Sequence, residues 1–141
     1  MHAVVIYESL TGNTRKAAQA LAAGLSAQGL TTVACPITDV DYQALQAADL
    51  VVVGGWVDGL LFVGQRPGRA GRFAKMPALA GKRTVVFLTY AIDAGKALDK
   101  LSAAVSARGA DVVGGITIRR DKLDQGVADL VGRILDVTAA T

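Results

Sequence analysis

Short apolar runs alternate along the chain with longer segments whose apolar positions recur at helical spacing. A continuous run of four to six apolar residues is typical of a strand buried on both faces, and recurrence every three to four residues is typical of a helix with one buried face. The runs predict five strands, at residues 3–7, 31–34, 49–54, 84–88 and 112–118. The helical spacing predicts helices at 14–28, 94–108 and 124–137, one helix near 69–76, and a short helix that ends at Ala47 and begins with Asp39 or Asp41 as its cap.

The order of these elements predicts an α/β fold. Apolar strands joined by helices form a parallel sheet with both faces covered, and right-handed crossovers then restrict the topology to a doubly wound sheet. We therefore expect a three-layer, doubly wound, five-stranded parallel sheet in one domain that spans residues 1–141. Gly114 and Gly115 predict a bulge in the fifth strand, and Gly29 and Gly109 predict the ends of two helices.

Composition excludes several classes of site. The chain has one Cys, Cys35, and one His, His2. A disulfide framework, a Ser-His-Asp triad and a metal centre rich in Cys or His are therefore excluded. The apolar runs are far shorter than the ~20 residues that span a bilayer. We expect a cytoplasmic protein with no membrane span, in which Cys35 is a small buried apolar residue.

Positive charge is concentrated in one part of the chain. Residues 59–92 hold six Lys and Arg residues and no acidic residue, which makes this stretch +6 and the remainder −3. Such a stretch is either a solvated loop and helix face or a docking surface for an acidic protein or an anionic ligand. Nucleic acid is not expected as a partner, because aromatic residues make up only 5% of the chain and only Phe73 lies among these basic residues.

The segment between the first strand and the first helix has the composition of an anion site. In open α/β sheets, ligands bind outside the carboxyl ends of the strands, and a helix start offers unpaired N–H groups and partial positive charge. Gly and Asn allow the left-handed turns of a backbone nest, and three hydroxyls add donors. An ordinary capped helix start would need only one of these residues, so we predict a phosphate site over Ser9, Leu10, Thr11, Gly12, Asn13 and Thr14.

These six residues match the T/S-x-T-G-x-T phosphate loop of flavodoxins, in the same place after the first strand. The chain has neither the dinucleotide fingerprint G-x-G-x-x-G nor the G-x-x-x-x-G-K-[ST] loop of nucleoside-triphosphate sites. In layout and length it resembles a short-chain flavodoxin. The resemblance implies a flavodoxin-like fold with strand order 2-1-3-4-5, and FMN bound with its phosphate in this loop.

The resemblance also implies two segments beside the flavin ring. Trp56 directly follows the third strand and Tyr90 directly follows the fourth, where aromatic rings would flank a flavin. In flavodoxins, a Gly-containing turn after strand three flips its peptide when the flavin takes up an electron and a proton, and Asp58-Gly59 is a turn dipeptide. The implied ring-side residues are Gly55, Trp56, Val57, Asp58 and Gly59 on one side, and Thr89, Tyr90, Ala91, Ile92 and Asp93 on the other.

The sequence departs from the flavodoxin pattern in three places. The aromatic residue Trp56 comes a few residues earlier than is common in the family, and Glu8 stands where small polar residues are common, so we expect its carboxylate to face away from a phosphate. The neighbouring connection is basic where flavodoxins are usually acidic. A redox partner would then present an acidic docking surface, or Arg66 or Arg69 would close over an anionic substrate. Asp93 is expected to cap the helix that follows it.

Three functions follow from these observations. The preferred hypothesis is an FMN-binding, flavodoxin-like electron-transfer protein, in which the cofactor carries the chemistry. The second is an FMN-dependent oxidoreductase that acts on an anionic, quinone or porphyrinogen substrate, and the basic connection favours it. The third is an interaction domain that keeps the fold without the flavin.

Overall fold

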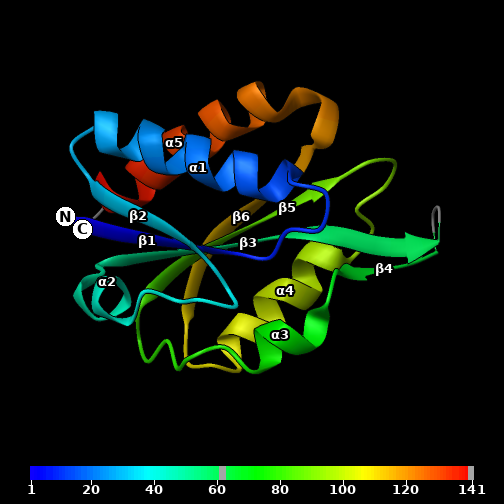
Figure 1. The fold of residues 1–141 in the computed structure, drawn as a ribbon, viewed down its shortest axis with the longest axis horizontal. Coiled ribbons are helices and arrows are strands. Elements are labelled where there is room, and N and C mark those ends of the chain that lie inside the picture. Colours follow the sequence, from blue (N-terminus) through cyan, green and yellow to red (C-terminus); the bar gives the residue numbers. More distant parts are fainter. Residues whose placement is uncertain (61–62, 140–141) are drawn as a thin grey trace.

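The computed structural model describes residues 1–60 and 63–139, and its centre is a mainly parallel sheet (Figure 1). The strands follow the order β2-β1-β3-β5-β6, and a further strand, β4, pairs antiparallel with β3. This order confirms the predicted 2-1-3-4-5 arrangement of the five parallel strands. The strands are β1 (His2–Tyr7), β2 (Thr31–Pro36), β3 (Leu50–Leu60), β4 (Val63–Pro67), β5 (Arg83–Tyr90) and β6 (Asp111–Arg119).

Helices cover both faces of the sheet, which gives the expected three layers. Figure 1 shows α1 and α5 on one face and α2, α3 and α4 on the other. The helices are α1 (Asn13–Ala27), α2 (Tyr42–Ala47), α3 (Ala70–Ala74), α4 (Ala97–Ser106) and α5 (Leu123–Ala139), with the 3₁₀ turn η1 (Arg120–Lys122) between β6 and α5. Among the described residues, no helix has the length and apolar character needed to cross a bilayer.

Alternate side chains of the central strands supply the two halves of the core. Val5 packs in the cluster beneath α1 and α5, whereas its neighbours Val4 and Ile6 pack in the cluster beneath α2, α3 and α4. All three are fully buried. The middle of each central strand is apolar at successive positions because both faces of the sheet are covered, which is why these strands appear as continuous apolar runs in the sequence.

The connection after β3 differs from the sequence-based expectation. The predicted third strand ends at residue 54, and a loop was expected before the helix near 69–76. Instead β3 continues to Leu60 and pairs antiparallel with β4, so the two strands form a hairpin. The dipeptide Asp58-Gly59 therefore lies in a strand rather than a turn. The register shifts between Asp58 and Leu60, and Gly59 has φ +156°.

Gly59 must remain glycine at this irregularity. A Cβ at this position would lie 2.9 Å from the Cα of Gln65, which is closer than side-chain carbons approach backbone atoms. The bulge brings the two strands of the hairpin close together, and it does so just beyond the parallel part of the sheet.

Most of the predicted helix ends are confirmed, and one helix start is not. The amide of Gly29 (φ +89°) bonds the carbonyl of Ser26 and terminates α1, and Asp41 caps α2 by accepting a hydrogen bond from the amide of Ala44. The helix expected to begin at Ala94 begins at Ala97, and its N-cap is Lys96 rather than Asp93. The reason is Gly95, whose left-handed φ of +52° cannot continue a helix. The predicted bulge in β6 is present: the pairing with β5 passes from Val112 directly to Gly114 and leaves residue 113 out.

Candidate functional site

The carboxyl ends of β1, β3 and β5 meet at one edge of the sheet, beside the start of α1 (Figure 1). A cleft of about 210 Å³ opens there, and we call it the edge cleft. It brings together residues that are far apart in the sequence. Its walls are Leu10, Thr11, Asn13, Thr14, Trp56, Val57, Thr89, Tyr90, Ala91 and Arg120.

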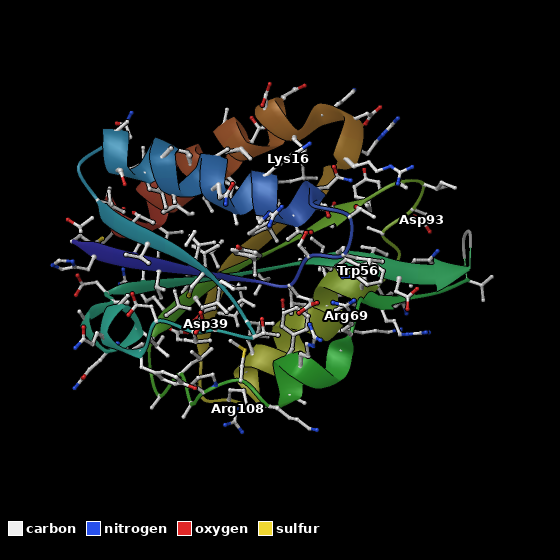
Figure 2. All side chains as sticks on the ribbon, in the orientation of Figure 1. Lys16, Asp39, Trp56, Arg69, Asp93 and Arg108 are labelled. Atoms are coloured by element: carbon white, nitrogen blue, oxygen red, sulfur yellow. The ribbon has the colours of Figure 1, made fainter. Side chains whose placement is uncertain are left out.

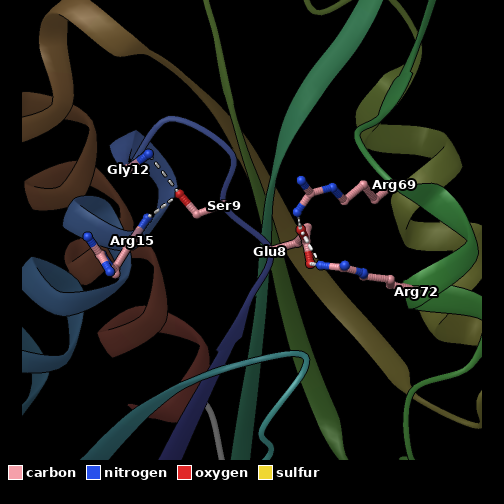
Figure 3. A network of polar contacts seen from close by, with 6 residues as sticks. All are labelled: Glu8, Ser9, Gly12, Arg15, Arg69 and Arg72. Carbon is pink, nitrogen blue, oxygen red and sulfur yellow. Dashed lines mark hydrogen bonds and ion pairs between the residues drawn. The ribbon is translucent and has the colours of Figure 1, made fainter.

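The loop that leads into α1 is organised around Ser9 (Figure 3). Gly12 is the N-cap, with a left-handed φ of +96°, and has no side chain with which to cap the helix. Ser9 supplies the cap instead, because its Oγ accepts hydrogen bonds from the amides of Gly12 at 3.2 Å and Arg15 at 3.3 Å. The loop is thereby folded back on the first turn of the helix.

Three other amides of this loop have no acceptor. Among the residues that the structure describes, the N–H groups of Thr11, Asn13 and Thr14 make no hydrogen bond to the protein. All three residues line the edge cleft. Unpaired amides at the positive end of a helix favour an anion, so the loop has the donors that the sequence-based phosphate site requires.

Thr14 has a structural contact that the sequence does not reveal. Its side chain is 1% exposed. Its Oγ1 donates to the carbonyl of Gly55 at 3.2 Å and lies 2.9 Å from the Oγ1 of Thr89. Thr14 therefore ties the start of α1 to β3 and β5, and Gly55 contributes this carbonyl rather than a wall of the cleft.

The two aromatic residues lie on neighbouring strands, β3 and β5, at the same cleft. Trp56, at the edge of the sheet in Figure 2, and Tyr90 both line it. The indole of Trp56 packs over Gly68, where a Cβ would lie 2.0 Å from the ring. Gly68 also donates its amide to the carbonyl of Trp56 at 2.7 Å. The indole Nε1 is buried and has no hydrogen-bond acceptor among residues 1–60 and 63–139.

The remaining predicted ring-side residues are partly separated from this cleft. A smaller adjoining hollow of about 100 Å³ is lined by Val57, Gly59, Gln65, Ala91, Ile92 and Asp93. Asp58 lines neither space, and its carboxylate forms an exposed ion pair with Arg66 at 3.3 Å. Thus Val57 and Ala91 connect the two spaces, whereas Asp58 is directed to its neighbouring strand.

Glu8 is held by the long basic connection. Its carboxylate is 2% exposed and accepts hydrogen bonds from Arg69 at 2.7 Å and from Arg72 at 2.9 Å to each oxygen. Figure 3 shows it directed toward these arginines and away from Gly12. This orientation agrees with the expectation that Glu8 faces away from a phosphate. Arg66 and Arg69, the expected substrate clamps, both have a carboxylate partner within the chain.

Two cleft residues are absent from the sequence-based prediction. Arg120 lines the edge cleft, and Gln65 lines the adjoining hollow from β4. Arg120 follows the last parallel strand, so applying the carboxyl-edge rule to that strand as well would have identified it. Gln65 could not be identified in this way, because its position depends on the unpredicted hairpin.

The fold is shared with known proteins. The family model for the flavodoxin domain matches residues 4–131. The solution structure of two-electron reduced Megasphaera elsdenii flavodoxin is 22% identical, with a TM-score of 0.68 over 82% of this chain and 85% of that chain. The Streptococcus pneumoniae TIGR4 flavodoxin is 23% identical, with a TM-score of 0.67 over 94% of this chain and 99% of that chain.

A larger protein contains the same fold as one part. Rubredoxin:oxygen oxidoreductase from the anaerobe Desulfovibrio gigas is 20% identical, with a TM-score of 0.69 over 99% of this chain but only 37% of that chain. No curated protein matches the sequence. The family match covers most of the chain and agrees with the sheet order. The chain therefore belongs to the flavodoxin domain family, whose members bind FMN and carry electrons.

Proposed function

We propose that FMN binds along the carboxyl edge of the sheet, with its phosphate at the loop before α1 and its ring in the edge cleft. The observation that carries this proposal is the set of unpaired amides at Thr11, Asn13 and Thr14, which adjoin a cleft lined by two aromatic rings. Gly12 is left-handed, a conformation found in anion-binding backbone nests, and the helix start supplies partial positive charge. The residues present therefore fit a phosphate monoester attached to a flat ring.

The protein's share of the work is to bind and orient the cofactor. FMN supplies a ring that takes up and releases one or two electrons. The indole of Trp56 and the phenol of Tyr90 offer surfaces against which a ring packs, and such contacts contribute about 0.5–1.5 kcal/mol beyond area burial. Ser9 holds the loop in shape, and Thr14 fixes it to the sheet. Val57, Gly59, Ile92 and Asp93 extend the same edge toward the hairpin.

We infer that the redox partner presents an acidic surface to this edge. Arg120 is the charged residue among the walls of the cleft, and the chain has a formal net charge of +3. Leu10 and Ile92 are 55% and 58% exposed beside it, so the edge also offers an apolar contact area. Opposite charge on the partner would steer the encounter. Since flavodoxins usually work in the cytoplasm, we assign this chain to the same compartment.

The proposal is tested by titrating the FMN-free protein with FMN and with riboflavin. Trp56 is the chain's only Trp, so quenching of its fluorescence reports occupancy of the edge cleft. FMN should bind at least about tenfold more tightly than riboflavin, because riboflavin lacks the group that the loop amides bind. Thr11→Val should lower the affinity for FMN but leave the affinity for riboflavin unchanged. Thr31→Val, at an exposed position on the distant strand β2, should change neither affinity.

Two results would overturn this assignment. Equal affinities for FMN and riboflavin would mean that the loop before α1 does not hold the phosphate. A flavin that binds without quenching Trp56 would place the ring outside the edge cleft.

A further inference from the structure

Glu8 carries a buried charge that the proposed binding of FMN does not use. Its side chain is 2% exposed, and its amide donates to the carbonyl of Gly54 in β3 at 2.9 Å, just beyond the end of β1. A carboxylate leaves water at a tolerable cost only where other groups compensate its charge. Arg69 and Arg72 supply that compensation from the chain that follows the β3–β4 hairpin.

Arg69 has an unusual backbone conformation. In the part of the chain that the structure describes, it is the one non-glycine residue with a positive φ, and its angles are φ 50° and ψ 49°. Side chains disfavour this left-handed conformation, which persists only where the surroundings enforce it. Arg69 is the N-cap of α3, and the bond from its Nη1 to Glu8 at 2.7 Å holds it there (Figure 3).

The residue before Arg69 supports the indole of Trp56. Gly68 is buried, and its amide continues the pairing of the hairpin by donating to the carbonyl of Trp56 at 2.7 Å. The indole occupies the space that a Cβ on Gly68 would fill. A displacement of Arg69 would therefore move Gly68 and the ring packed on it, and this ring is a wall of the edge cleft.

Arg72 binds the same carboxylate from a different position. Its Nη1 contacts both oxygens of Glu8 at 2.9 Å, and the residue lies within α3 rather than at its N-cap. Phe73, the next residue, is fully buried in the core and anchors this part of the helix. The placement of Arg72 is thus fixed by α3 itself, whereas the placement of Arg69 depends on its bond to Glu8.

We propose that Glu8 is a positioning residue for the flavin: through Arg69 and Gly68 it fixes the indole of Trp56 as a wall for the ring. The inference rests on the proposed binding of FMN in the edge cleft. It adds to that proposal a residue that is not among the walls of the cleft. It also gives the buried carboxylate a role on the hairpin side of the sheet, away from the phosphate.

The test compares Arg69→Gln with Arg72→Gln in the FMN-free protein. Each substitution removes one guanidinium from Glu8 and leaves the other in place. Arg72→Gln should lower the urea midpoint at least as far as Arg69→Gln does, because Arg72 contacts both carboxylate oxygens. Only Arg69→Gln should shift the emission of Trp56 to longer wavelength, because the indole then loses its fixed support and becomes more exposed.

Riboflavin tests the ring contact without the phosphate. Its affinity, followed by the fluorescence of the flavin, should fall about two- to tenfold in Arg69→Gln, the change that corresponds to the loss of an aromatic contact. The affinity for FMN should fall by the same factor, since the loop before α1 keeps its amides. Glu8→Gln should reproduce both losses, and Arg72→Gln should show neither.

Three outcomes would overturn the proposal. The first is an Arg69→Gln variant with unchanged Trp56 emission and unchanged affinity for riboflavin. The second is an equal effect of Arg72→Gln, which would indicate a general loosening of α3. The third is a larger loss for FMN than for riboflavin, which would place the effect in the phosphate loop.

Failure of the proposed function would give a different result. In that case the unmodified protein would bind neither flavin in the edge cleft. The emission comparison between Arg69→Gln and Arg72→Gln would then decide by itself whether Arg69 positions the indole.

Discussion

The hydroxyl of Thr14 lies 2.9 Å from the hydroxyl of Thr89, although 75 residues separate them in the sequence. Both side chains are buried, at 1% and 3% exposure. The contact joins the first turn of α1 to the end of β5, and the bond from Thr14 to the carbonyl of Gly55 joins the same turn to β3. Thr14 thus positions the loop before α1 on the sheet.

Thr14→Val should therefore act mainly on stability. The substitution keeps the shape of the side chain but leaves the carbonyl of Gly55 and the hydroxyl of Thr89 without this partner. Removing one member of a buried hydrogen-bonded set costs about 1–3 kcal/mol, measured as the free energy of unfolding in urea. Thr11→Val, at an exposed position of the same loop, should stay within about 0.5 kcal/mol. Equal denaturation midpoints for the two variants would show that the Thr14 contacts contribute nothing to the stability of the fold.

Glu8→Gln should destabilise the protein, because it removes the charge that Arg69 and Arg72 share. Hydrogen bonds to a charged group are worth about 1.5–3 kcal/mol, and the exposure of both arginines to solvent places the expected loss at the lower end of this range. The control is Asp58→Asn, which breaks an ion pair whose side chains are 58% and 43% exposed. Its effect should be at most about 1 kcal/mol. A larger loss from Asp58→Asn than from Glu8→Gln would contradict this ranking.

Gly68→Ala should move the indole of Trp56. The new Cβ would overlap the ring, which must shift or rotate, and overpacking of this kind costs about 1–3 kcal/mol. Because Trp56 is the only Trp, a change in its emission maximum reports the movement directly. Gly71→Ala is the control, since a Cβ there meets no atom of the residues that the structure describes within 4 Å, and Ala favours the helix by about 0.5–1 kcal/mol. An unchanged emission spectrum in Gly68→Ala would mean that the ring does not rest on residue 68.

The parallel sheet could be predicted from the sequence because its strands are apolar on both faces. Runs such as residues 3–7 and 84–88 are short and rich in β-branched residues, which favours buried strands, and the crossover rules then fix the layers. The β3–β4 hairpin could not be predicted in this way. Its residues lie beyond the covered part of the sheet, glycines interrupt them, and Gly64 and Pro67 are typical of a loop. Pairing between the two strands, rather than local preference, decides their structure.

Part of the site could likewise be predicted from the sequence, and part could not. The loop before α1 carries a local signal, since the residue types that make an anion nest occur together. The pairing of Glu8 with Arg69 and Arg72 spans 61 and 64 residues and has no such signal, because a carboxylate and an arginine are compatible with many partners. The start of α4 was misplaced because Gly95 has the freedom to be left-handed, and a sequence does not show whether that freedom is used.

The positive charge of Arg120 at the edge cleft, on a chain with a formal net charge of +3, should set the preference for small redox partners. Reduced, FMN-loaded protein should be oxidised by anionic ferricyanide at a rate that falls as salt is added, and by cationic hexaamminecobalt(III) at a rate that rises. Arg120→Gln should slow the ferricyanide reaction about two- to fivefold at low salt, because it removes a charge at the cleft. Arg133→Gln, at an exposed position of α5 outside the cleft, should have little effect. The opposite salt dependence would exclude an acidic partner surface.

Cys35 should make the folded protein less stable at alkaline pH. Burial is the main cause that raises the pKa of its thiol, and the negative charges of Asp41 and Asp39 add to this, against one backbone hydrogen bond from Asp41 that lowers it. Since the folded state holds the proton more tightly, the stabilising contribution is complete below the unfolded pKa of about 8.5 and is lost as the pH rises through the folded pKa.

The measurement compares the unmodified protein with Cys35→Ala in urea denaturation between pH 7 and pH 10. Other groups titrate in both proteins, so the difference between their unfolding free energies isolates the thiol. Relative to Cys35→Ala, the unmodified protein should lose up to about 1.4 kcal/mol of unfolding free energy per pH unit between the unfolded and folded pKa values of the thiol. Below pH 8 the difference between the two proteins should be constant. The buried thiol should also react slowly with a thiol reagent at pH 8, because only the thiolate is nucleophilic. A difference that stays constant up to pH 10 would mean that folding leaves the pKa of Cys35 unchanged.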